Sequence, residues 1–161
     1  MLLLLQISLL VLCANGAPVL AQHLFKGTVL SGAIDNGLLL KDQRPLFGVA
    51  KTWGGILASV VLTSLLALLI GLPIVLGSLV AILAMLGDLI SSFIKRRLGF
   101  YASSQAVGLD QIPESLLPWI FITQYYQLSA YYLVSGVVIF FILELVLSRL
   151  LHKVGIRKHP Y

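Results

Sequence analysis

An uncharged, strongly apolar stretch in the middle of the chain constrains the fold more than any other feature. No charged residue occurs from Gly54 through Gly87. Gly71–Leu72–Pro73 interrupts the apolar block near its middle, and such a combination ends helices and forms turns. Each half has about 20 residues, which is the length that an α-helix needs to cross a bilayer. The pattern therefore predicts a tight helical hairpin with transmembrane segments at 54–71 and 73–93.

Three further apolar stretches extend this argument to the whole chain. The 161 residues are 59% hydrophobic and 11% charged, with a mean hydropathy of +1.02, whereas soluble domains carry about 25% charged residues. We therefore expect an all-α, polytopic membrane helix bundle that forms a single integral membrane domain over residues 1–161. Its about five transmembrane helices include spans at 2–22, 114–128 and 129–150. Glu144 lies deep in the last span, where a carboxyl group is expected to be neutral or paired.

The first apolar stretch also has some features of a targeting signal. Met1–Leu12 precedes Cys13, which is typical of a signal peptide or a lipoprotein site. However, a basic region is missing, and Leu12 is a poor small residue before the cysteine, so we expect a retained first helix. Cys13 is the only cysteine, which excludes an internal disulfide and a cysteine metal site.

The positive charges predict the orientation in the membrane. Loop 23–52 has four Lys or Arg, loop 94–114 has three and the C-terminal end has four, whereas the turn at 71–73 has none. Cytoplasmic loops of membrane proteins are enriched in Lys and Arg. We therefore expect both loops and the C-terminus to lie on the cytoplasmic side, and we expect the protein to lie in the plasma membrane. The net charge of +5 belongs to these clusters and does not indicate nucleic-acid binding.

The end of the third predicted span carries a distinctive polar face. In a helix, Asp88, Ser91, Ser92 and Lys95 are spaced at i, i+3, i+4 and i+7 and lie on one side, with Arg96 beside them. A carboxylate at the end of a membrane helix is costly and marks a functional candidate. The carboxylate can hold Mg²⁺, and the cations can hold phosphate oxygens. The alternative is a basic helix end that only anchors the protein at the membrane surface.

The predicted topology brings polar residues from both loops and three helix ends to one side of the membrane. Carboxylates mixed with cations and hydroxyls suit a nucleoside triphosphate with Mg²⁺. Walker A, GxGxxG and HExxH patterns are missing from the sequence, which argues against a P-loop site, a Rossmann site and a metalloprotease. The candidate site residues are Asn15, Asp35, Lys51, Thr52, Asp88, Ser92, Lys95, Arg96, Asp110 and Gln111.

Four sequence pieces, in this order, resemble the CDP-archaeol synthase family, which is related to the CTP:phosphatidate cytidylyltransferases. The pieces are Ala14–Asn15–Gly16–Ala17–Pro18, then Asp35–Asn36–Gly37 with residues 41–48, then Lys51–Thr52–Trp53–Gly54–Gly55, and finally residues 87–99 with Asp110–Gln111. Three positions depart from the usual family pattern. The chain has Asp42–Gln43–Arg44–Pro45 in place of Asp–Gly–Arg–Arg, Gly54 in place of Arg, and residues 101–108 in place of Gly and Pro before Asp–Gln.

The resemblance implies a CTP-dependent nucleotidyltransferase of phospholipid biosynthesis. Such an enzyme transfers a cytidylyl group to a phosphate lipid of the archaeal ether type or to phosphatidate, forms a CDP-archaeol or CDP-diacylglycerol type product, and releases pyrophosphate. The implied Mg²⁺ ligands are Asp88 and Asp110, which are catalytic together with Lys95. The other candidates bind substrate: Lys51 and Arg96 hold phosphates, Asn15 and Thr52 orient CTP or metal-bound water, and Asp35, Ser92 and Gln111 complete the set.

Two other classes of function remain open. The same charges would suit a small-molecule or ion transporter, and a non-catalytic membrane partner protein is the second alternative. A transporter places its site near the bilayer midplane, often at broken helices. Here the charges gather at one face, which favours an enzyme that acts on a lipid headgroup.

Overall fold

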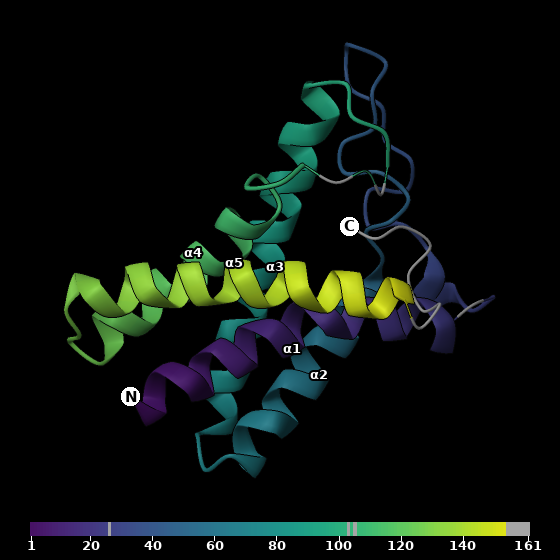
Figure 1. Cartoon of the computed structure of the whole chain (residues 1–161). Helices are drawn as coiled ribbons and strands as arrows, with labels where there is room; N and C mark the ends of the chain where they lie inside the picture. The colour runs from purple at the N-terminus through teal and green to yellow at the C-terminus, as the bar shows by residue number, and fades with distance from the viewer. Residues whose placement is uncertain (26, 103, 105, 154–161) are drawn as a thin grey trace.

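The computed structural model describes residues 1–25, 27–102, 104 and 106–153, except the side chains of residues 23, 151 and 152. The described residues form five α-helices, one short 3₁₀ helix and no β-strand (Figure 1). The α-helices are α1 (Leu2–Leu24), α2 (Trp53–Leu69), α3 (Ile74–Arg97), α4 (Gln111–Tyr125) and α5 (Ala130–Lys153), and the 3₁₀ helix is η1 (Val29–Ser31). The all-α prediction is confirmed, and each predicted span overlaps one helix. The basic tail predicted at 152–161 lies mostly outside the described residues, which exclude the side chain of residue 152 and all of residues 154–161.

Helices α1, α3 and α5 are long and apolar enough to cross a membrane. The other two are shorter, since α2 has 17 residues and α4 has 15 with Pro118 inside it. At a rise of about 1.5 Å per residue they extend about 25 and 22 Å, less than a hydrocarbon core of about 30 Å. A polar residue and a helix breaker flank α2: Thr52 caps its start, and Gly71 follows its end.

The predicted hairpin between α2 and α3 is present. Gly71 adopts a φ of +79°, which favours glycine because it has no Cβ. The Leu72 N–H donates to the Ala67 carbonyl at 2.8 Å and satisfies one of the last carbonyls of α2. Pro73 is the N-cap of α3, which begins at Ile74. From this turn α3 extends through the molecule to the long loops at its other end (Figure 1).

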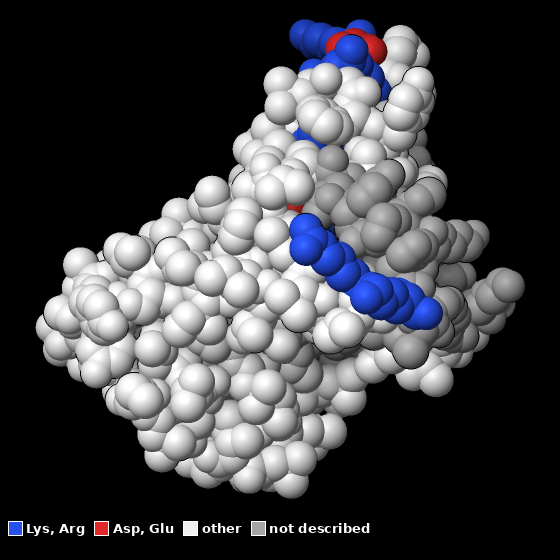
Figure 2. Space-filling view, viewed as in Figure 1, with Lys and Arg blue, Asp and Glu red and all other residues white. Residues whose placement is uncertain are grey.

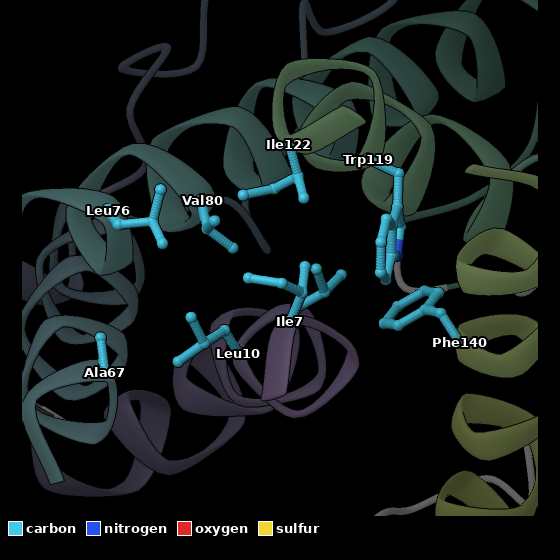
Figure 3. Close-up of a cluster of buried hydrophobic side chains, with 9 residues drawn as sticks. Ile7, Leu10, Ala67, Leu76, Val80, Trp119, Ile122 and Phe140 are labelled. Carbon is cyan, nitrogen blue, oxygen red and sulfur yellow. The ribbon is translucent and has the colours of Figure 1, made fainter. Parts of the chain in front are cut away.

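The apolar core lies where the helices meet (Figure 3). Figure 3 shows Ile7 and Leu10 of α1 opposite Val80 of α3 and Ile122 of α4, with Trp119 and Phe140 side by side at one edge. The fully buried core side chains therefore come from all five helices, and Ala67 is the small contribution of α2.

Two glycines of α3 allow its neighbours to approach closely. A Cβ on Gly77 would lie 2.6 Å from the Cβ of Ala67 in α2. A Cβ on Gly87 would lie 2.1 Å from the Pro113 carbonyl oxygen and 2.7 Å from the Glu114 Cα. Real Cβ atoms do not come this close to other atoms, so the crossing of α3 and α4 depends on glycine at position 87. This crossing brings the start of α4 beside Asp88.

Charge is segregated along the molecule. Figure 2 shows basic and acidic side chains gathered at the end where α3 meets the loops, and a basic strip over the C-terminal part of α5. The remaining surface in this view is almost free of charge. The apolar side chains exposed on the helices therefore suit contact with lipid, and the charged end suits contact with water.

Candidate active site

Lys51 and Asp88 form the first ion pair of the site. Lys51 immediately precedes the cap of α2, and Asp88 lies in α3. The Lys51 Nζ donates to both carboxylate oxygens of Asp88, at 2.6 and 2.5 Å. Burial acts to lower the pKa of Lys51, but the charges of Asp88, Glu114 and Asp110 raise it above its ordinary value. The ammonium therefore stays charged and compensates the carboxylate.

Glu114 is the second carboxyl group at this point and was not among the predicted site residues. It lies in the first turn of α4, its side chain forms a hydrogen bond with Asp88, and the residue is 7% exposed. Two carboxyl groups in contact repel each other unless a proton or a cation lies between them. In the sequence, the one available signal was the i, i+4 spacing of Asp110 and Glu114 at a loop–helix boundary. The contact itself follows from the close approach at Gly87.

Lys95 and Asp110 form the second ion pair. The Lys95 Nζ lies 2.6 Å from Asp110 Oδ1 and also donates to the Ser104 carbonyl at 3.0 Å. The other oxygen of Asp110 accepts the Ala106 N–H at 2.8 Å. These contacts fold the loop between α3 and α4 back onto the last turns of α3. As the sequence predicted, the loop thus carries a carboxylate to the basic end of α3.

Arg96 adds a buried positive charge beside Asp110. It is 4% exposed, and its guanidinium interacts electrostatically with Asp110. Its Nε is buried and has no hydrogen-bond partner among the residues that the structure describes. A buried donor without a partner is costly, so Arg96 is suited to receive an anionic ligand.

A cavity of about 380 Å³ lies next to Arg96. One wall comes from the loop between α1 and α2, and the other from Arg96 and the residues that follow α3. The lining residues are Asp35, Gly37, Gln43, Arg44, Pro45, Gly48, Val49, Arg96, Gly99, Phe100, Tyr101 and Ala102. The combination of cations, aromatic side chains and backbone groups suits a polar ligand with a planar ring.

Asp35 organises the first wall of this cavity. Its Oδ1 accepts the Gly37 N–H at 3.0 Å, and its Oδ2 accepts the Phe47 and Gly48 N–H groups, both at 2.9 Å. Partial burial acts to raise the pKa of Asp35, but these backbone donors hold it below its ordinary value. The Asp35 carboxylate therefore joins two parts of the loop, near residues 37 and 47–48, and also lines the cavity.

Three of the remaining predicted residues, Thr52, Gln111 and Asn15, have partners close to them in sequence. The Thr52 Oγ1 accepts the Gly55 N–H at 3.1 Å and caps α2. The Gln111 Oε1 accepts the Gly108 N–H at 2.7 Å. The Asn15 amide donates to the Val11 carbonyl at 3.0 Å, and its Oδ1 is buried without a partner in the described part of the chain. Ser92 is 1% exposed in α3, one turn from Asp88. Their roles toward a substrate remain predictions.

The carboxylates do not form a complete metal cage. Within residues 1–25, 27–102, 104 and 106–153, no group of three or more His, Cys, Asp or Glu side chains is placed to hold a metal ion. The carboxyl group in contact with Asp88 is that of Glu114, whereas Asp110 is paired with Lys95. However, proteins usually bind Mg²⁺ through only one or two carboxylates, and water and substrate phosphates fill the other coordination positions.

Comparisons with known proteins agree with this arrangement. Residues 70–161, more than half of the chain, match the family model described as CarS-like, CDP-archaeol synthase. The CDP-archaeol synthase of Hyperthermus butylicus is 40% identical over 107 residues, which cover 63% of this chain and 60% of that protein. The CDP-archaeol synthase of Sulfurisphaera tokodaii is 34% identical over 126 residues, or 74% of this chain and 76% of that protein.

A solved structure extends the similarity to the whole fold. It is described as an intramembrane enzyme for archaeal membrane lipids biosynthesis, and it superposes with a TM-score of 0.73 at 28% identity over 88% of this chain and 89% of that chain. The three long apolar helices and this neighbour identify an integral membrane protein. Because the family model, the related sequences and the superposed fold agree, this chain belongs to the CDP-archaeol synthase family.

Proposed function

We propose that this protein transfers a cytidylyl group from CTP to the phosphate of a membrane lipid and releases pyrophosphate. One observation supports this activity most strongly. The buried Arg96 lines a cavity and interacts with Asp110, which is paired with Lys95. A second ion pair joins Lys51 to Asp88, which lies on the same helix α3 as Arg96. Cations here can hold phosphates of a soluble nucleotide, while the helices keep a lipid alongside.

The reaction is a displacement at phosphorus. An oxygen of the lipid phosphate attacks the α-phosphorus of CTP, and the bond from that phosphorus to the oxygen shared with the β-phosphate breaks. The CDP-lipid forms, and pyrophosphate takes the electron pair of the broken bond. Such transfers depend on positioning and charge neutralisation rather than on a nucleophilic side chain.

Each part of the charged end has a task in this proposal. Lys51, Lys95 and Arg96 hold the phosphates, and the cavity with Phe100 and Tyr101 accommodates the nucleoside. Asp35 holds one wall of that cavity in place, because its carboxylate accepts the Phe47 and Gly48 N–H groups.

Family enzymes are cytidylyltransferases that generally use a divalent metal ion, and the residues fit one. Asp88 and Glu114 are two carboxyl groups in contact, and this contact needs a positive charge or a proton between them. With phosphate oxygens and water they meet the preference of Mg²⁺ for oxygen ligands. The bound ion would neutralise charge on the triphosphate. This assignment adds Glu114 to the predicted Mg²⁺ ligands Asp88 and Asp110, of which Asp110 is paired with Lys95.

The substrate lipid in this proposal is a phosphate lipid of the archaeal ether type. The support is that the related proteins are CDP-archaeol synthases. The whole chain acts as one integral membrane domain, and the site lies on the cytoplasmic side of the plasma membrane. The support for this orientation is the Lys and Arg content of the loops that carry the site.

A direct assay tests the proposal. Purified protein in lipid nanodiscs receives CTP labelled at the α-phosphate, Mg²⁺, and either the phosphate of a dialkyl glycerol ether or phosphatidate. We expect a labelled CDP-lipid with the ether lipid, and none when Mg²⁺ is removed with a chelator.

Asp88→Asn provides the matched negative control for this assay. Because it removes one carboxylate charge without changing the size of the side chain, we expect a rate loss on the order of a thousandfold. The helix content measured by circular dichroism should not change. Folded wild-type protein that forms no CDP-lipid from either lipid would contradict the proposed activity.

A further inference from the structure

Two arginines, Arg44 and Arg97, join the two walls of the cavity. Arg97, the last residue of α3, donates through Nη2 to the Arg44 carbonyl at 3.2 Å and to the Pro45 carbonyl. Arg44 in turn donates through Nη1 to the Arg97 carbonyl and to the Arg96 carbonyl at 3.4 Å. Each arginine therefore binds the backbone of the other. We name this reciprocal contact the arginine clasp.

The clasp supplies a donor to the last carbonyl of α3 and a second donor to the Arg96 carbonyl, which also accepts the Gly99 N–H at 3.2 Å. The last carbonyls of a helix have no partner within the helix, and α3 ends at Arg97. Arg44 supplies donors to two of these carbonyls and places a positive charge where the helix dipole favours one. The clasp is therefore a specific helix cap that is provided by a distant loop.

The Arg97 side chain is fixed on further sides. Its Nη1 lies 2.5 Å from Asp42 Oδ1, and its guanidinium lies over the Phe93 ring at 5.3 Å from the centroid. Asp42 is 43% exposed, so this ion pair alone contributes little. The planar guanidinium, which reaches two carbonyls and a carboxylate at once, is what the position requires.

The clasp lies directly behind the cavity. Arg44 and Pro45 line the first wall, and Arg96 and Gly99 line the second. Gly99 has a φ of +83°, and a Cβ there would lie 3.4 Å from the Arg44 guanidinium. Arg97 is absent from the lining. It therefore holds both walls without contacting what the cavity contains.

We propose that Arg97 is a positioning residue for the nucleotide: it fixes the loop of residues 42–48 against the end of α3, so that Asp35 and Arg96 border one cavity of constant width. The inference rests on the proposed function, because it assigns the cavity to CTP. Loss of the clasp widens the cavity and weakens nucleotide binding, whereas the lipid phosphate and the ion pairs of Lys51 and Lys95 stay in place.

Arg97→Lys tests this role because it keeps the charge and loses the planar fork. We expect the KM for CTP to rise about tenfold, while kcat at saturating CTP and the KM for the lipid change less than about twofold. Asp42→Asn should raise the KM for CTP less than about threefold, because its ion pair is exposed. The double variant should resemble Arg97→Lys alone to within about threefold, since the exposed ion pair with Asp42 contributes little. Lys41→Arg, at an exposed position next to Asp42, is the control and should leave both constants unchanged.

A second measurement does not depend on activity. Spin labels at Gln43 and Tyr101, on opposite walls, in a Cys13→Ser background should give a narrow distance distribution with Arg97 and a broader one in Arg97→Lys. An unchanged distribution together with an unchanged KM for CTP would overturn the proposal. A fall in kcat alone, with the KM constant, would also overturn it, because it would mean a smaller folded fraction. Failure of the proposed function would appear differently, as wild-type protein that makes no CDP-lipid.

Discussion

At the scale of single residues, the site is a set of buried and partly buried ionisable groups that contact one another in pairs. Lys51 lies against Asp88, Asp88 against Glu114, and Lys95 against Asp110. Each carboxylate that lies near or within the membrane region has a partner, as the cost of burying a charge requires. A ligand that brings negative phosphates must draw the lysines away from these partners. The resting ion pairs therefore hold the cations in place until the nucleotide arrives.

Glu114→Gln tests the second carboxyl group. The amide keeps the size and one acceptor but cannot supply a second negative charge to a cation, so the Mg²⁺ concentration for half-maximal activity should rise at least tenfold. Glu114→Asp keeps the charge on a shorter side chain, so its Mg²⁺ concentration for half-maximal activity should lie between those of the wild type and Glu114→Gln. The measurement is a Mg²⁺ titration of CDP-lipid formation. An unchanged titration curve in Glu114→Gln would remove Glu114 from the proposed metal site.

Lys51→Arg separates phosphate binding from simple attachment to the membrane surface. Attachment needs only positive charge and tolerates arginine. The two short contacts to Asp88 fit a compact ammonium, and the wider guanidinium fork does not match them. We expect normal insertion and folding with loss of most CTP-dependent activity, measured in the labelled-CTP assay. Full activity with an unchanged KM for CTP would make Lys51 an anchor.

At the scale of helices, packing depends on a few glycines at crossings. Gly136 of α5 lies against the ring of Trp119 in α4, and a Cβ there would lie 2.0 Å from the ring. Trp119 is fully buried, so the ring cannot move into free space. Together with Gly87 and Gly77, this position determines how closely the neighbouring helices lie.

Gly136→Ala should destabilise the bundle by about 1–3 kcal/mol, which is typical of overpacking in a core. Gly16→Ala is the matched control, because nothing lies within 4 Å of a Cβ at Gly16. There, alanine should be neutral or slightly stabilising, since it favours the helix. Thermal unfolding in detergent measures both. Trp119→Leu in the Gly136→Ala background should recover part of the loss, and equal unfolding temperatures for the two glycine variants would contradict this account.

The helices themselves were largely predictable from the sequence, but their contacts were not. The hairpin at 71–73 and the five apolar stretches follow from local composition, and they correspond to α1–α5 within a few residues at most ends. The prediction that Asp88 and Lys95 share a helix is confirmed because α3 continues through Arg97. The Asp88–Glu114 contact and the arginine clasp join residues far apart in sequence. They depend on the crossing at Gly87 and on how a loop folds, which local patterns do not encode.

At the scale of the whole molecule, the charged end should lie on one side of the membrane. Both walls of the cavity come from loops that contain Lys and Arg, whereas the hairpin turn contains neither. Single cysteines at Lys41 and Tyr101 in a Cys13→Ser background should react with an impermeant reagent from the cytoplasmic side. A cysteine at Pro73 should react from the opposite side. Labelling of Lys41 and Tyr101 from different sides would contradict both the topology and the shared site.

The length of α3 has a kinetic consequence. Its 24 residues extend about 36 Å, about 6 Å more than a hydrocarbon core of about 30 Å, so a helix that crosses this core upright reaches the lipid headgroups with about one turn. A lipid substrate then arrives by two-dimensional diffusion within the bilayer, while the nucleotide arrives from bulk water. We expect the turnover rate to follow the mole fraction of phosphate lipid in the bilayer. Added inert lipid lowers this mole fraction and should slow the enzyme, even when the bulk concentration of the phosphate lipid is held constant.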